Sequence, residues 1–298
     1  MPSILLRGHH GLGDNLHQRA IVRQLLAAGN DVWIETTWPS VYHDLPVHCV
    51  RKPSSLRTQA KNLEREADRF STTPVPGDAR VIQLRYDVHS VRAAGSVLGG
   101  MRCPGFDPAT ADFRMPVPIP WRTQADQILL NVGWNGCDPI LFFRPLVERS
   151  EFRAGAQRNP NHVAYIRLFR ELGSRYFVVS VADVEPNKEW IVGERIWTDA
   201  AFHRGELTFE DMAAIASVSD LVYCAPGFAT VLAQAVETPC ITVFGGYERG
   251  YSFSAGAAWS PYLAIEPIEP CDCFDRRHCC RKDIDLPSAL DALRGFVG

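Results

Sequence analysis

Residues 207–246 read LTFEDMAAIASVSDLVYCAPGFATVLAQAVETPCITVFGG, and this stretch decides the fold. Helical patterns at 208–218 and 229–237 alternate with short apolar runs at 220–225 and 240–246. Helices that alternate with short, continuously apolar strands are typical of a parallel sheet covered on both faces. The stretch therefore predicts part of an α/β domain.

Glycine follows each of the two predicted strands. Gly227 ends the turn Ala225-Pro226-Gly227 directly before a helix, where it allows a ligand to approach the backbone closely. The first N–H groups of that helix have no partner within the helix and attract anions. The residues predicted to hold a phosphate group through their backbone are Gly227, Phe228, Ala229, Thr230, Gly245 and Gly246.

The same alternation occupies the rest of the chain, in two halves separated by a proline-rich stretch at 104–121. The segments predicted to be strands are 4–6, 31–36, 47–52, 79–86, 127–134, 139–145 and 176–183. We expect two Rossmann-like domains that face each other across a cleft, since ligands bind beyond the carboxyl ends of such sheets. The expected domains are 1–125 and 126–285, followed by a C-terminal helix, 286–298, that is free to pack back on the first domain.

The first predicted strand leads into a glycine-rich turn, RGHHGLGD at 7–14. Its glycines do not have the G-x-G-x-x-G spacing of a dinucleotide-binding loop, and Asp14 would place a negative charge where a pyrophosphate lies. Asp14 is therefore either a catalytic or substrate-orienting carboxylate or the cap of the following helix. His9 and His10 precede it and are candidates to orient it or to bind a substrate.

Composition bounds the class of protein. The chain has 298 residues, of which 46% are hydrophobic, and no apolar stretch is long enough to span a membrane. No secretory leader is recognisable, so we expect a cytoplasmic protein without a transmembrane segment. Residues 1–130 contain 15 basic and 12 acidic residues, whereas 131–298 contain 16 and 22. This asymmetry favours an anionic partner for the first half.

Four of the nine cysteines lie in the segment CDCFDRRHCC, which also contains His278. The candidate metal ligands are Cys271, Cys273, Cys279 and Cys280. Their C-x-C-x5-C-C spacing lacks the usual pair of C-x-x-C knuckles. A structural zinc ion, free thiols and a local disulfide therefore all stay open at this stage.

Several of these motifs together resemble a known family. GLGD at 11–14, the stretch 207–246 and the cysteine-bearing tail look like the heptosyltransferase-type glycosyltransferases of family 9. The resemblance covers the first 35 residues and much of 140–285. It implies the GT-B fold, an acceptor-binding first domain and a second domain that binds a nucleotide-sugar donor. It also implies inverting sugar transfer that needs no catalytic metal or other cofactor.

The resemblance carries over to individual residues. Asp14 matches the acid that serves as catalytic base, Glu185 an acid that contacts the donor ribose, and Gly227 the phosphate-side loop. Arg144, ahead of Arg149 and Arg153, is the candidate to neutralise the leaving diphosphate. The family usually has Asp-Ser/Thr-Gly and then a histidine three residues later, whereas this chain has Ala225-Pro226-Gly227 and Thr230. This departure favours another nucleotide-activated sugar over ADP-heptose.

The candidate acceptor-binding residues are His9, His10, Arg85 and His89. The expected acceptor is anionic: a phosphorylated envelope glycan such as the lipopolysaccharide core, or a hydroxymethylated base in DNA. Two alternatives keep the same fold, because a fold does not determine a function. They are a nucleotide-sugar epimerase and a sugar-nucleotide-binding protein without catalysis.

Overall fold

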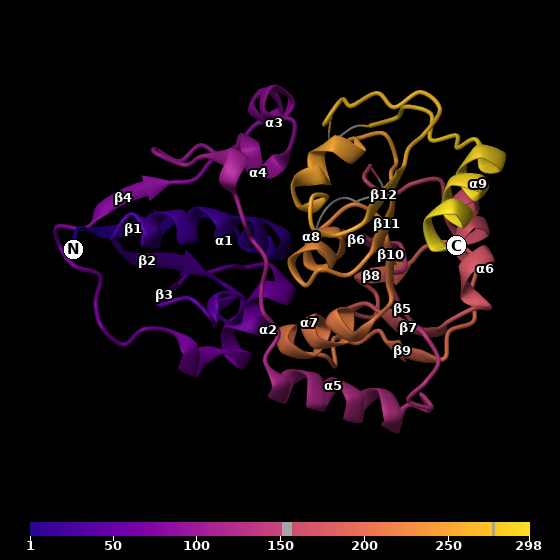
Figure 1. Ribbon diagram of the computed structural model, residues 1–298, viewed down its shortest axis with the longest axis horizontal. Helices are drawn as coiled ribbons and strands as arrows, with labels where there is room; N and C mark the ends of the chain where they lie inside the picture. The colour runs from indigo at the N-terminus through magenta and orange to yellow at the C-terminus, as the bar shows by residue number, and fades with distance from the viewer. Residues whose placement is uncertain (151–156, 276–277) are drawn as a thin grey trace. The chain divides into compact units, whose positions relative to one another are not determined.

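The computed structural model describes residues 1–150, 157–275 and 278–298, so Arg153 lies outside the described residues. The chain divides into two compact units, Met1–Pro116 and Val117–Gly298 (Figure 1). Each unit is built around a parallel sheet with helices beside it. None of the helices in the described part of the chain is both long enough and apolar enough to cross a membrane.

The first unit contains a four-stranded sheet in the order β3-β2-β1-β4, in which all neighbours are parallel. Its strands are β1 (Ser3–Arg7), β2 (Asp31–Thr36), β3 (His48–Arg51) and β4 (Arg80–Gln83). The helices of this unit are α1 (Leu12–Ala27), α2 (Arg57–Arg65), α3 (Val88–Ala94) and α4 (Val97–Gly100). The three 3-10 turns are η1 (Pro39–Tyr42), η2 (Ala67–Arg69) and η3 (Pro108–Thr110).

The second unit contains a six-stranded parallel sheet in the order β12-β11-β10-β5-β7-β9 and an antiparallel pair, β6 with β8. The strands of the large sheet are β5 (Ile140–Phe143), β7 (Phe177–Val181), β9 (Ala200–Phe202), β10 (Leu221–Cys224), β11 (Cys240–Val243) and β12 (Tyr262–Ile265). The remaining elements are β6 (Val147–Arg149), β8 (Glu189–Ile191), α5 (Ile119–Asn131), α6 (His162–Gly173), α7 (Phe209–Val218), α8 (Phe228–Ala235), η5 (Gly250–Gly256) and α9 (Leu286–Val297).

The central strands of the large sheet are buried along their whole length, because helices cover both faces. Every residue of β5, β10 and β11 is buried, as expected for parallel strands between two helical layers. Successive side chains of a strand point to opposite faces. One face forms a core with α6 and α9, and α8 packs against β10 and β11 on the other (Figure 1).

The C-terminal helix α9 packs within the second unit. It lies against α6 and β12, and Nε of Arg294 donates a hydrogen bond of 2.9 Å to Glu171 on α6. Leu293 of α9 is fully buried in the shared core. The apolar face of α9, the helix predicted at 286–298, is therefore packed against the second unit itself.

One predicted strand is wrong. Residues 127–134 were expected to form a strand, but they belong largely to α5, which packs against α7. Pro120 lies in the first turn of α5, where proline is tolerated. Ala125 and Leu129, four residues apart, form the buried side of the helix, so the apolar run follows helical rather than strand periodicity.

The buried side chain of Arg19 links several segments of the first unit through hydrogen bonds. Arg19 on α1 is fully buried, and its two terminal nitrogens each donate to one carboxylate oxygen of Asp44 over 2.8 Å. Its guanidinium also donates to the carbonyl oxygens of Val41, Phe113 (3.3 Å) and Arg114 (2.9 Å). A buried charge is stable only when it is paired and its donors are satisfied, and this network meets both conditions.

The Arg19 network predicts an acid-sensitive stability. Burial alone raises the pKa of Asp44, but hydrogen bonds from Arg19 and its charge outweigh burial and hold that pKa below its ordinary value. The folded state therefore favours the carboxylate, and this stabilisation is complete above the unfolded pKa of about 3.9 and lost as the pH falls through the folded pKa. Between about pH 5 and pH 3, we expect the free energy of unfolding to fall more steeply in the wild type than in Asp44→Asn. Chemical denaturation at each pH measures this, and equal slopes would remove Asp44 as the cause.

Candidate active site

In the first unit the order of the strands reverses between β1 and β4. The chain adds β2 and β3 on one side of β1 and then returns to its other side. Ligands of open parallel sheets bind at such a reversal, beyond the carboxyl ends of the strands. Asp14 follows β1 at this edge, and Tyr86 follows β4. The Tyr86 hydroxyl donates a 3.0 Å hydrogen bond to Oδ1 of Asp14, so the two flanking loops meet at this carboxylate.

Asp14 does not cap its helix. Gly11 occupies the N-cap position of α1, and Asp14 lies in the first turn, so the capping alternative is wrong. A Cβ on Gly11 would lie 2.6 Å from Oδ2 of Asp14, which shows that the carboxylate lies over the glycine turn. Asn15, which is buried, holds this turn through hydrogen bonds to the carbonyls of Gly11 (2.8 Å) and His9 (3.1 Å). The side chain of Asp14 is partly exposed at the sheet edge.

The two histidines of the turn lie beside this carboxylate. The His9 ring is 4.7 Å from the Tyr86 ring, centroid to centroid. Burial lowers the pKa of His9, which the charge of Asp14 partly opposes, and burial also lowers the pKa of His10. Nε2 of His9 and Nδ1 of His10 are screened from solvent and have no hydrogen-bond partner among the described residues. Buried polar atoms are normally satisfied, so these nitrogens suit a bound molecule.

Lys52 also lies at the carboxyl edge of this sheet, although it was not among the site residues predicted from the sequence. It follows β3, and its Nζ donates a hydrogen bond to the carbonyl of Gly8 in the glycine turn. Burial lowers its pKa, and the nearby Glu35 opposes that change. Arg85 and His89 are exposed. The first unit therefore gathers part of the predicted acceptor set at one edge and adds Tyr86 and Lys52.

The second unit has its own reversal, between β5 and β10. Arg144 follows β5 directly, and its backbone N–H donates to the carbonyl of Tyr223 on β10 over 2.9 Å. Its Nη1 donates to the carbonyl of Val181 at the end of β7 (2.9 Å), and the guanidinium carbon lies 4.7 Å from the centre of the Phe228 ring. Burial is the main reason that the pKa of Arg144 falls to about 10, so the side chain stays cationic at neutral pH.

The helix that begins beside Arg144 has an open first turn. Gly227 is the N-cap of α8 with φ +156° and ψ −154°, a conformation that essentially only glycine adopts, and no side chain caps the helix. The first N–H groups of a helix lack partners within it, and these belong to Phe228, Ala229 and Thr230. Thr230 is buried as a whole residue, and its hydroxyl lies 3.0 Å from that of Thr242, so Phe228 is the residue of this first turn that is partly exposed.

The turn after β11 lies on the next strand of the same sheet. A Cβ on Gly245 would come within 2.4 Å of the carbonyl oxygen of Asn159, so a larger residue would push these two backbone segments apart. Gly246 has φ +85°, in the left-handed region that favours glycine. Both glycines are therefore required by the backbone here.

Glu185 and Arg149, the other residues predicted to bind the donor, each interact with a nearby side chain. Oε1 of Glu185 accepts a 3.0 Å hydrogen bond from Lys188 in the turn before β8. Arg149 lies on β6 and pairs with the buried Glu189 over 3.2 Å. Of the three arginine candidates, Arg144 is the one that the described residues place at the strand reversal. The contact of donor ribose with Glu185 stays a prediction.

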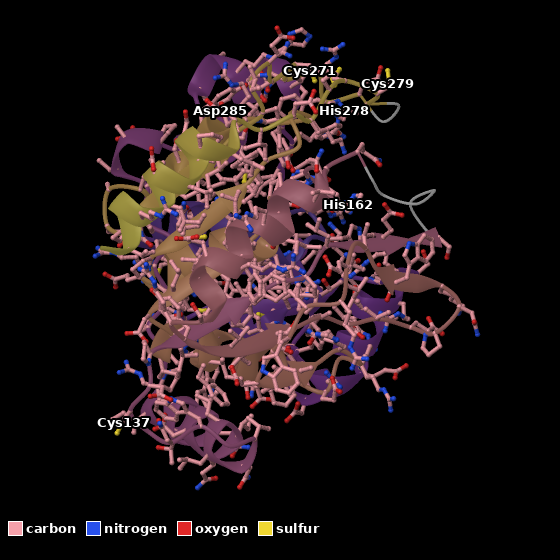
Figure 2. The ribbon with its side chains drawn as sticks, turned by 90° about the vertical axis from the view of Figure 1, so that its right-hand side faces the viewer. Cys137, His162, Cys271, His278, Cys279 and Asp285 are labelled. Atoms are coloured by element: carbon pink, nitrogen blue, oxygen red, sulfur yellow. The ribbon has the colours of Figure 1, made fainter. Side chains whose placement is uncertain are left out.

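The cysteine segment comes together with a different set of ligands from the one predicted. One donor atom each of Cys271, Cys273, His278 and Cys280 lies within 4.8 Å of all the others. Cys279 is exposed and is not in this group (Figure 2). The prediction of Cys279 was wrong because adjacent residues direct their side chains differently, which spacing alone does not show. No disulfide joins the nine cysteines, all of which are free.

No family model matches the chain, and no curated protein matches it in sequence. Solved structures match along nearly its whole length. A family 9 glycosyl transferase from Veillonella parvula DSM 2008 aligns with a TM-score of 0.63 at 11% identity, covering 99% of this chain and 97% of that one. The ADP-heptose lipopolysaccharide heptosyltransferase II of E. coli gives 0.61 at 13%, covering 100% and 98%. The iron-containing dodecameric glycosyltransferase TibC of enterotoxigenic E. coli H10407 gives 0.62 at 13%, covering 99% and 75%. The chain therefore has the α/β fold of the family 9 glycosyltransferases and ADP-heptose heptosyltransferases.

Proposed function

We propose that this protein is a metal-independent, inverting glycosyltransferase of the GT-B type. One observation carries the proposal: each unit places a chemically suited group at the carboxyl edge of a parallel sheet, where the strand order reverses. The first unit has the carboxylate of Asp14 there, and the second has the cation of Arg144. Such reversals are where this class of sheet binds its ligands.

The second unit is proposed to bind the donor, a nucleoside-diphosphate sugar. Arg144 and the open first turn of α8 offer a cation and backbone N–H donors side by side, the combination that suits a diphosphate. The same groups would stabilise the charge that grows on the diphosphate as it leaves, in place of a metal ion. The likeness to an enzyme named for ADP-heptose supports a nucleotide-sugar donor. The altered Ala225-Pro226-Gly227 turn favours a sugar other than heptose.

The proposed reaction is a single displacement. An acceptor hydroxyl attacks the anomeric carbon of the donor sugar, its proton passes to the Asp14 carboxylate, and the bond to the diphosphate breaks with its electron pair. A base positioned in this way typically accelerates proton transfer by 10²–10⁴-fold. The hydrogen bond from Tyr86 orients the carboxylate and leaves Oδ2 on the side of the glycine turn. Attack from the opposite side of the leaving group inverts the anomeric carbon.

The first unit is proposed to bind an anionic saccharide such as a phosphorylated envelope glycan. Lys52 supplies a positive charge next to the glycine turn, and His9 and His10 supply the buried, unpartnered nitrogens described above. A hydroxymethylated base in DNA is the alternative acceptor. Binding to DNA releases counterions, so that alternative requires an affinity that falls steeply between low and moderate salt.

Replacing Arg144 tests the donor site. In Arg144→Met we expect roughly ten- to hundredfold weaker donor binding, because a hydrogen bond to a charged group is worth about 1.5–3 kcal/mol. Arg167→Met, which removes an exposed arginine from α6, is the matched control and should bind as the wild type does. Thermal shifts against UDP-, GDP- and ADP-linked sugars, ADP-heptose included, measure binding, since a ligand of the folded state raises the melting temperature. Equal shifts in wild type and Arg144→Met would contradict the assignment.

A further inference from the structure

Hydrogen bonds join residues 271–275 and 278 to the glycine turn after β11. The backbone N–H of Asp272 donates to the carbonyl of Gly246 over 2.8 Å, and that of Phe274 donates to the carbonyl of Tyr247 over 3.0 Å. Asp272 and Phe274 have φ values of +50° and +52°. Residues other than glycine rarely adopt this conformation unless the surroundings impose it, so the segment is held in a specific shape on both sides of Cys273.

The four clustered side chains have the chemistry of a metal site. Nδ1 of His278 lies 3.3 Å from the sulfur of Cys271 and 3.2 Å from that of Cys273. Ligands on a tetrahedral zinc ion are separated by roughly 3.5–3.8 Å, given bonds of about 2.0–2.3 Å. These two spacings are slightly shorter than this range, and all four donor atoms lie within 4.8 Å of one another. The backbone N–H of Asp275 also points at the sulfur of Cys273, 3.4 Å away, where it would favour a thiolate.

A hydrogen bond between the His278 ring and the backbone fixes which ring nitrogen carries the hydrogen. Nε2 lies 3.0 Å from the carbonyl oxygen of Gly245. A carbonyl oxygen only accepts, so Nε2 carries the hydrogen and Nδ1 of the neutral ring presents its lone pair to the cysteines. A histidine that binds a metal typically donates its other N–H to a carbonyl or carboxylate in this way. This contact is therefore the outer-shell partner of a metal ligand.

We propose that Cys271, Cys273, His278 and Cys280 bind one divalent ion of the soft, tetrahedral class, with zinc as the expected ion. Three thiolates and one imidazole suit zinc or iron rather than magnesium or calcium, which prefer oxygen. Four protein ligands fill a tetrahedral shell, so the ion is structural rather than catalytic. Binding converts the three thiols to thiolates and releases their protons to solvent.

The ion would also fix the Gly245-Gly246 turn, whose backbone the sequence predicts to hold a phosphate group of the donor. The ligand His278 bonds to the carbonyl of Gly245, and the neighbouring Asp272 bonds to that of Gly246. Removing the ion frees the segment that holds both carbonyls. This part rests on the proposed function, and it predicts that the apo protein binds nucleotide sugar more weakly than the metal-bound protein.

Cys279 and Cys280 are adjacent in the chain but only Cys280 belongs to the proposed site, so substituting each one in turn gives a matched test. The full-length protein is purified, its zinc and iron are counted by mass spectrometry, and the site is then reloaded with Co²⁺. We expect one ion per chain in the wild type and in Cys279→Ser, and loss of the ion in Cys280→Ser and in His278→Ala. Cobalt in the wild type should show thiolate charge-transfer and tetrahedral d–d absorption. A wild type that holds no zinc or iron and gives no such spectrum overturns the proposal, as does loss of the ion in Cys279→Ser or its full retention in Cys280→Ser.

The cobalt spectrum of the wild type decides the matter even if Cys280→Ser fails to fold. The donor coupling has its own readout, the thermal shift of metal-bound and chelator-treated wild type with nucleotide sugars. Weaker binding by the apo protein supports the coupling. Equal binding overturns the coupling and leaves the metal site standing. If no nucleotide sugar binds either form, the proposed function fails, whereas the count of bound ions still stands.

Discussion

Asp14→Asn should lose about 10²–10⁴-fold in sugar transfer while it binds donor as tightly as the wild type. The amide keeps the size of the side chain and can still accept the hydrogen bond from Tyr86, but it cannot take a proton from the acceptor. Because Arg144 and α8 lie in the other unit, the substitution leaves the proposed donor groups unchanged. The rate of transfer at saturating donor and the thermal shift by donor are the two measurements.

The matched control for this experiment is Asp78→Asn. Asp78 is exposed and precedes β4, so it lies at the amino end of the sheet rather than at the carboxyl edge. The Asp78→Asn variant should transfer sugar at the wild-type rate. Wild-type activity in Asp14→Asn would show that another group accepts the proton, and reduced donor binding would show that Asp14 acts on binding instead.

Arg19→Met should strongly destabilise the first unit. It keeps the apolar length of the side chain but leaves the carboxylate of Asp44 and three carbonyl oxygens without their donor. Removing one partner of a buried ion pair costs about 3–5 kcal/mol. Asp44 is 16% exposed and keeps a 3.6 Å ion pair with Arg23, so the lower end of this range applies. We expect a loss of this size in the free energy of unfolding, measured by chemical denaturation.

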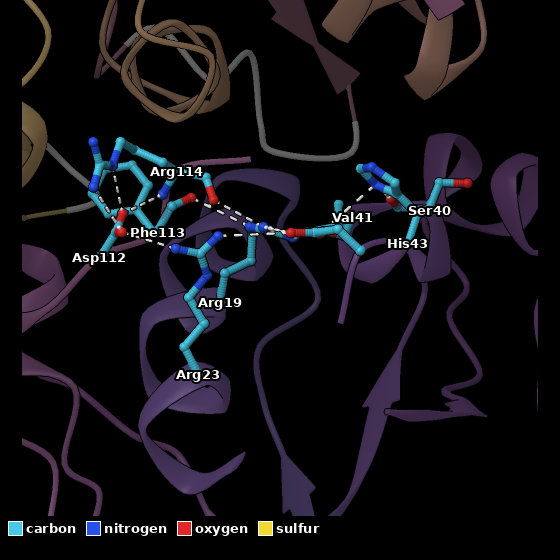
Figure 3. A network of polar contacts seen from close by, with 9 residues as sticks. Arg19, Arg23, Ser40, Val41, His43, Asp112, Phe113 and Arg114 are labelled. Carbon is cyan, nitrogen blue, oxygen red and sulfur yellow. Dashed lines mark hydrogen bonds and ion pairs between the residues drawn. The ribbon is translucent and has the colours of Figure 1, made fainter. Parts of the chain in front are cut away.

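Arg23 is a natural comparison for Arg19, since it lies one turn along the same helix (Figure 3). It pairs with Asp112 over 2.8 Å and more distantly with Asp44 over 3.6 Å, and it is 30% exposed, whereas the Arg19 side chain is fully buried. Exposed pairs contribute about 0–1 kcal/mol, so Arg23→Met should change stability little. Equal losses in the two variants would mean that burial of the Arg19 network is not what stabilises this unit.

Much of the fold could be predicted from the periodicity of the sequence. Continuous apolar runs gave β5, β10 and β11, because strands buried on both faces need no polar side. The strand predicted at 127–134 failed because a short apolar run is compatible with either a strand or a segment of a helix, and 127–131 form the last turns of α5. Propensity alone could not decide between them, and packing against α7 did.

Site residues could be predicted from the sequence only where they lie together in one continuous motif. Asp14 and Gly227 stand out because a glycine turn between strand and helix is visible in the sequence. Tyr86 and Lys52 were missed, since they follow separate strands and reach the glycine turn only through the order of the sheet. The choice of His278 over Cys279 likewise depends on side-chain direction, which the spacing of residues does not contain.

Turnover of a nucleotide sugar with and without acceptor tests the central proposal most directly. The protein is given the donor that gives the largest thermal shift, alone or with a phosphorylated core oligosaccharide or hydroxymethylated DNA. We expect one nucleoside diphosphate released for each sugar joined to an acceptor, and nuclear magnetic resonance of the product should show an inverted anomeric centre. Interconversion of the donor sugar without acceptor, or a product of retained configuration, would contradict single displacement assisted by Asp14.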